Sequence, residues 1–75
     1  MQERDLRQLR RLKLLTQKEL AQAVGVEYQA VQRWEAGTRY PRPAQQRKLA
    51  EVLAVTPEEL LAALDQSAAE GKAAA

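Results

Sequence analysis

Residues 16–37, TQKELAQAVGVEYQAVQRWEAG, predict two short helices joined by a tight turn. Thr16 followed three residues later by Glu19 is a capping box, in which each side chain satisfies the backbone N–H of the other residue. Apolar residues then recur at helical spacing, and Gly25 is the residue type that most easily ends a helix in the left-handed conformation. We therefore expect a first helix that begins after Thr16, buries its apolar side and stops at Gly25.

The second helix of this stretch, from about Glu27 to Ala36 with its end at Gly37, has two chemically different faces. Val31 and Trp34 belong to an apolar side that should be buried. The opposite side presents amide, phenol and guanidinium groups, from Tyr28, Gln29, Gln32 and Arg33. Glutamine can form two hydrogen bonds to an adenine edge and arginine two to a guanine edge, in a major groove that admits a helix. This face therefore indicates contact with the bases of double-stranded DNA.

The segments L-T-Q-x-E-L-A, G-V, W-E-x-G and R-Y-P, in this order, are similar to the lambda-repressor-like (Cro/XRE) helix-turn-helix family of phage and bacterial transcription regulators. The resemblance covers about residues 6–64. It implies an all-α fold, a compact bundle of about five short helices, which binds operator DNA as a dimer.

Several residues near the predicted recognition helix are expected to contact DNA. The residues expected to contact bases are Gln17, Glu27, Tyr28, Gln29, Gln32 and Arg33. Those expected to contact phosphates are Lys18, Arg39, Tyr40 and Arg42. Glu27 is favourable at a helix N-terminus and unfavourable beside phosphate, although it could accept a hydrogen bond from cytosine. Tyr40 could stack beneath Trp34 or donate its hydroxyl to a phosphate, and burial is the more common fate of such a ring.

The resemblance also implies a structural ion pair between Arg10 and Glu35. Arg10 lies on the apolar side of a first helix expected at about residues 3–14, and loss of either partner of a buried pair is costly. The family usually has glycine where this chain has Leu14 and Ala54. Either the helices before these residues end differently, or the two residues absorb a small strain.

The C-terminal half predicts two more helices. Pro43 suits the first position of a helix that runs to about Leu53, and V-T-P-E-E-L begins a fifth helix that should end near Asp65. Two of the leucines of this last helix should belong to the core, and the rest should form an exposed patch suited to a dimer partner. The possible dimer contacts are Leu60, Leu61 and Leu64.

We expect residues 1–66 to form the DNA-binding domain, with the helix-turn-helix at about 16–37. Residues 67–75 have no predicted core residue. They should form a flexible tail or the start of a linker to an absent C-terminal domain.

The composition argues against an enzyme and against a cofactor site. The chain has neither Cys nor His, so the commonest general base, the thiolate nucleophile and the commonest metal ligand are all missing. Residues 1–42 hold nine Lys or Arg against five acidic residues, and residues 43–75 hold three against five. A basic half that contains the helix-turn-helix fits a partner that carries phosphate. No apolar run approaches the roughly 18 residues that a membrane helix needs, so we expect no membrane contact and a cytoplasmic, nucleoid-associated location.

These observations favour a sequence-specific transcriptional regulator, a repressor that binds a pseudo-palindromic operator through the major groove. Its partners would be double-stranded DNA and a second copy, at least on DNA. The alternative is a protein-interaction module of the same fold, an antitoxin component or a bridging factor, because fold does not fix function.

Overall fold

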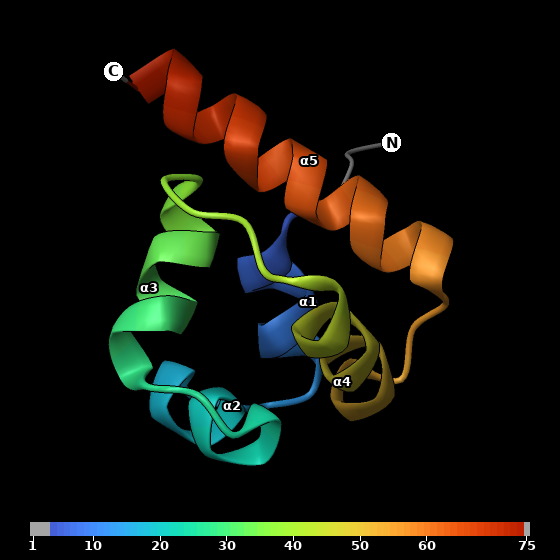
Figure 1. Cartoon of the computed structure of the whole chain (residues 1–75). Coiled ribbons are helices and arrows are strands. Elements are labelled where there is room, and N and C mark those ends of the chain that lie inside the picture. Colours follow the sequence, from blue (N-terminus) through green and yellow to red (C-terminus); the bar gives the residue numbers. More distant parts are fainter. Residues whose placement is uncertain (1–3, 75) are drawn as a thin grey trace.

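The computed structural model describes residues 4–74. It contains five helices and, within these residues, no strand (Figure 1): α1 (Leu6–Leu12), α2 (Gln17–Val24), α3 (Tyr28–Ala36), α4 (Pro43–Leu53) and α5 (Pro57–Ala74). The predicted all-α bundle is confirmed. Helix α5 lies along one side of the bundle and packs against α1, α3 and α4, while α2, at the other end, packs against α3 and α4. No helix in the described part of the chain is both long enough and apolar enough to cross a membrane.

The core draws side chains from all five helices. It is built mainly from leucines, whose side chains interdigitate at close-packed density where the helices meet. The buried apolar residues are Leu6, Leu9, Leu20, Ala21, Val31, Trp34, Leu49, Leu53, Leu60, Ala63 and Leu64.

Most predicted helix ends are confirmed by hydrogen bonds. The Thr16 hydroxyl accepts from the Glu19 N–H at 3.1 Å, and the Glu19 carboxylate accepts from the Thr16 N–H at 2.8 Å. The same reciprocal pair opens α5. Gly25 and Gly37 end α2 and α3 with φ of 84° and 77°. The first helix is shorter than predicted: it begins at Leu6 after an Asp5 cap and ends at Leu12, and Glu3 lies outside the described residues.

Leu14 and Ala54 adopt the left-handed conformation that glycine would normally supply. Their φ angles are 57° and 56°. The sequence left open whether the helices end differently or whether these two residues absorb strain. The positive φ angles show that the two residues are strained. The Cβ of such a residue crowds the neighbouring backbone at a cost of about 1–2 kcal/mol.

The end predicted for the last helix is wrong, because α5 continues past Asp65 to Ala74. The expectation that no core residue follows position 66 is also wrong, since Ser67 is buried. Its hydroxyl accepts a hydrogen bond from the Leu6 N–H at 3.1 Å, which satisfies a donor that the first turn of α1 leaves free. Its carbonyl lies so close to Gly37 that a Cβ there would overlap it. Small residues thus let α5 approach the ends of α1 and α3.

Candidate nucleic-acid interface

The α2–α3 turn is fixed by backbone hydrogen bonds. The N–H groups of Gly25 and Val26 both donate to the Ala21 carbonyl, at 2.8 and 2.9 Å. Glu27 occupies the N-cap position of α3, but its side chain makes no capping hydrogen bond. The Glu27 carboxylate is therefore exposed at the positive end of the α3 dipole, where a negative charge is favourable.

Helix α3 buries one face and exposes the other. Val31, Trp34 and Glu35 are buried against the bundle. The opposite side exposes Gln29, Gln32 and Arg33, while Tyr28 is half-buried. The two faces are those predicted from the sequence. The exposed groups are hydrogen-bond donors and acceptors of the kind that read base edges.

Three of the predicted DNA-contacting residues form one small cluster. The Gln32 amide donates to the Tyr28 hydroxyl at 2.9 Å, and the Lys18 ammonium lies 5.7 Å from the centre of the Tyr28 ring. A cation over an aromatic ring is worth about 0.5–1 kcal/mol at an exposed site. The Gln32 side chain is thus pre-oriented, with one amide N–H and its carbonyl oxygen still available to a base.

Behind α3, the Glu35 carboxylate joins three helices. The Arg10 Nε lies 2.5 Å from one Glu35 oxygen, and the Arg10 Nη2 donates to the other at 3.2 Å, so the predicted ion pair is present. The Gln17 amide donates to Glu35 at 2.9 Å, and the Arg7 Nε lies 3.7 Å away. Gln17 was predicted from sequence only as a DNA contact. One of its amide N–H groups is engaged inside the protein, and the other remains available.

The loop after α3 carries two of the basic residues that the sequence predicts as phosphate contacts. Arg39 and Arg42 are exposed. The loop is tied to α3 because the Thr38 N–H and hydroxyl both bond to the Arg33 carbonyl.

Burial of the Tyr40 ring, which the sequence favoured, is wrong: Tyr40 is exposed. Its hydroxyl donates to Asp65 of α5 at 3.2 Å. Partial burial, followed by the nearby Asp65 charge and this hydrogen bond, raises the pKa of Tyr40 above 10.0. Asp65 had no predicted role, because its partner lies 25 residues away in the chain.

The possible dimer contacts separate into two groups. Leu60 and Leu64 are buried in the core of this chain, and Leu61 is exposed. Only Leu61 is therefore available to a second copy.

No group of three or more Asp or Glu side chains suited to a metal ion occurs among the described residues. Comparison with curated proteins and with solved structures gives no match. A family model described as helix-turn-helix matches residues 6–60, which contain the α2–α3 unit and its polar outer face. The chain therefore belongs to the Cro/XRE family of DNA-binding helix-turn-helix regulators.

Proposed function

We propose that this regulator is a sequence-specific repressor that binds a pseudo-palindromic operator as a dimer. Each copy would place α3 in a major groove, with the two grooves about 34 Å apart along the DNA.

The observation that carries the proposal is the contrast between the two faces of α3. Its buried face is held by Val31, Trp34 and the ion-paired Glu35, so the helix cannot rotate without exposing a core. Its exposed face carries Gln29, Gln32 and Arg33 with no aliphatic side chain among them. Two bidentate contacts, each worth about 1–3 kcal/mol of discrimination, would give useful specificity.

The phosphate contacts would come from the loop after α3 and from the start of α2. Arg39 and Arg42 project from a loop that is anchored to the last turn of α3. Gln17 stands at the N-terminus of α2, where the helix dipole favours an anion and where its second amide N–H is free to donate. Lys18 would contribute less as a phosphate contact, because its ammonium already lies over the Tyr28 ring.

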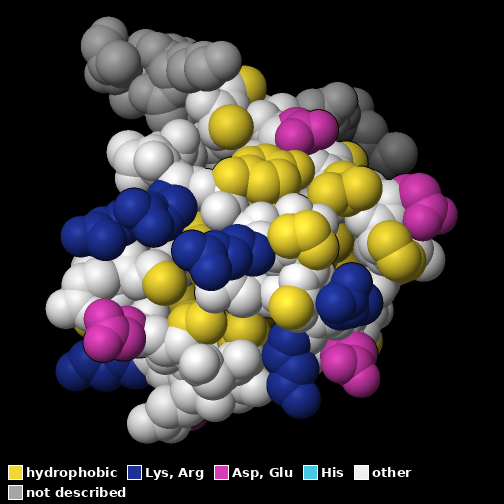
Figure 2. All heavy atoms as spheres, in the orientation of Figure 1, with side chains coloured by type: hydrophobic (Ala, Val, Ile, Leu, Met, Phe, Trp, Pro, Cys, Tyr) yellow, Lys and Arg dark blue, Asp and Glu magenta, His cyan; other side chains and the backbone are white. Residues whose placement is uncertain are grey.

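The dimer contact would lie on the face made by α4 and α5. Figure 2 shows apolar side chains gathered on this face, with both basic and acidic side chains around them. A depression of about 150 Å³ lies between the two helices, lined in part by Pro43, Ala50, Pro57 and the exposed Leu61. The same patch on two copies would form a self-complementary interface.

A variant of the outer face tests this proposal. Gln29→Ala should change the preferred base at one position of each half-site and alter the free energy of unfolding by less than about 0.5 kcal/mol, because Gln29 is exposed. Both are measured by selection from a random duplex library and by urea titration. Glu51→Ala, a change at another exposed residue, on α4, serves as control and should leave the base preference as it is. Unchanged preference in Gln29→Ala, or a large loss of stability, would count against base reading by this face.

A further inference from the structure

Two large apolar side chains, Leu12 at the end of α1 and Leu14 just after it, are strongly exposed. Leu12 is 58% exposed and Leu14 is 90% exposed, the highest values among the large apolar residues of the described chain. A single exposed leucine is common on protein surfaces and requires no explanation. Two strongly exposed leucines separated by one residue in the chain are less usual, because exposed apolar side chains that gather in one region mark interaction sites.

Two independent observations show that leucine at position 14 does not stabilise the fold. Its φ of 57° is strained for any residue with a Cβ, and its side chain gains almost nothing from burial in this chain. Glycine would fit the same backbone without strain, so the fold itself gives no reason for leucine here. A locally strained residue that does not contribute to folding points to a role outside the folded chain.

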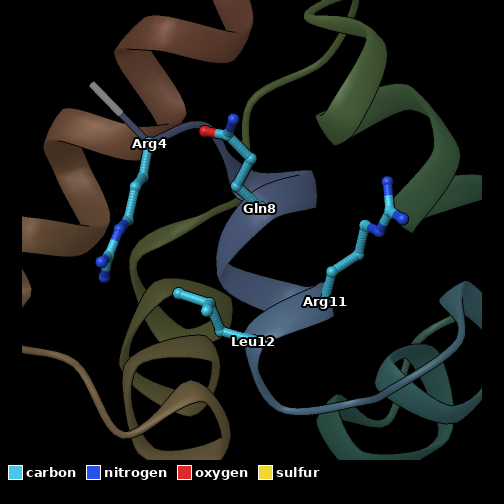
Figure 3. Close-up of a pocket in the computed structure, with 4 residues that line it drawn as sticks. All are labelled: Arg4, Gln8, Arg11 and Leu12. Carbon is cyan, nitrogen blue, oxygen red and sulfur yellow. The ribbon is translucent and has the colours of Figure 1, made fainter. Parts of the chain in front are cut away.

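The surface around Leu12 is basic and partly concave. A shallow depression of about 400 Å³ lies along α1, with Arg4 and Leu12 on one side and Arg11 on the other (Figure 3). Gln8 lines the same depression and supplies an amide. Within residues 4–70, no carboxylate lies within 4.0 Å of the charged groups of Arg11 or Lys13. We call this surface the leucine edge; it comprises Arg4, Gln8, Arg11, Leu12, Lys13 and Leu14.

We propose that the leucine edge docks an acidic segment of a partner protein, which places one or two apolar side chains against Leu12 and Leu14. The positive charge of the edge favours an acidic partner. The exposed leucines favour a partner with an apolar side chain that can pack against them, and a DNA backbone has none. The depression suits a short helix or an extended peptide, with Gln8 available for a directional hydrogen bond. This surface is distinct from the outer face of α3, so the inference goes beyond the proposed function and does not depend on it.

The probe for the test is a displayed library of random peptides, panned against the whole chain. Enriched sequences should combine acidic residues with one or two large apolar residues. A representative labelled peptide should bind in fluorescence anisotropy, and its affinity should fall as salt rises, because charge contributes to recognition.

Two glycine variants separate a docking role from a structural one. Leu14→Gly should raise the urea midpoint, since it relieves strain, and should weaken the peptide at least tenfold. Ala54→Gly relieves the same backbone strain at the end of α4, outside the leucine edge, and should leave peptide binding unchanged. Leu12→Ser should weaken the peptide to a similar degree. Affinity of each variant for duplex DNA, measured in parallel, should stay at the wild-type value.

The proposal is overturned if panning enriches no acidic and apolar sequences, or if enriched peptides bind Leu14→Gly and Leu12→Ser as tightly as the wild type. Self-association through this edge would also overturn it. This outcome would be seen as a dimer in sedimentation that Leu14→Gly abolishes, together with a panning experiment that enriches no peptide. Unchanged base preference in Gln29→Ala would count only against base reading by α3, and peptide binding that depends on Leu12 and Leu14 would still support the docking proposal.

Discussion

Replacement of Arg10 by alanine probes the contact that holds the recognition helix in place. The Arg10 side chain is 12% exposed and that of Glu35 is 1% exposed, so the two charges meet away from water. Arg10 makes two contacts with the carboxylate, and its Nη1 donates to the Leu15 carbonyl at 2.9 Å, which ties the α1–α2 turn to the same side chain. Arg10→Ala removes all three contacts and leaves a buried carboxylate.

The expected loss of stability follows from what remains around Glu35. Breaking a buried ion pair by removing one partner costs about 3–5 kcal/mol. Gln17 still donates to the carboxylate, and Arg7 at 3.7 Å can move closer, so we expect a value at the lower end, about 3 kcal/mol. For a domain of this size that corresponds to a fall in Tm of about 12–24 °C.

Urea titration at low temperature measures the effect, with fluorescence of Trp34, the only tryptophan and a buried one, as the signal. Arg7→Ala is the matched control: this arginine approaches the same carboxylate from the same helix, but it is 60% exposed, so its loss should cost at most about 1 kcal/mol. A loss below about 1 kcal/mol in Arg10→Ala would refute the reasoning. So would a stable variant with selectively weakened DNA binding.

Three further predictions concern α5 and the residues that it contacts. Gly37→Ala should destabilise the chain by about 1–3 kcal/mol more than Gly25→Ala in urea titration, because φ is positive at both but only at Gly37 would the Cβ meet the backbone of α5. Ser67→Ala should cost about 1–3 kcal/mol, since a buried N–H of α1 loses its acceptor; a neutral result would show that the segment after residue 66 does not support the domain. The raised pKa of Tyr40 means that its contribution to stability is complete below pH 10.0 and is lost as the pH rises through the raised value, so wild type should lose stability there more steeply than Tyr40→Phe. Identical alkaline slopes would argue against the bond to Asp65.

Local signals predicted the helix-turn-helix well. Helix ends are fixed by interactions between residues that are close in the sequence, so they can be predicted without knowledge of the rest of the fold. Examples are the reciprocal pair of Thr16 and Glu19 and the two glycines that end α2 and α3. The two faces of α3 follow from the helical period alone.

Contacts between distant segments were harder to predict. Ser67 is small and polar, so neither hydropathy nor period marks it as a core residue, and only the close approach of α5 to Leu6 and Gly37 gives it that role. Tyr40 escapes burial because Asp65 offers its hydroxyl a partner near the surface. The sequence allowed either a different helix end or strain at Leu14, and only the positive φ angle in the structure decides between them.

The most direct test of the central claim is selection of bound sites from a random duplex library, followed by titration of the selected site and a scrambled duplex across a range of salt. We expect a pseudo-palindrome with half-sites about one helical turn apart, bound at least roughly 10³-fold more tightly than the scrambled duplex. Enrichment of no sequence, with weak and steeply salt-dependent binding to both duplexes, would contradict the account, because it would leave only attraction to phosphate.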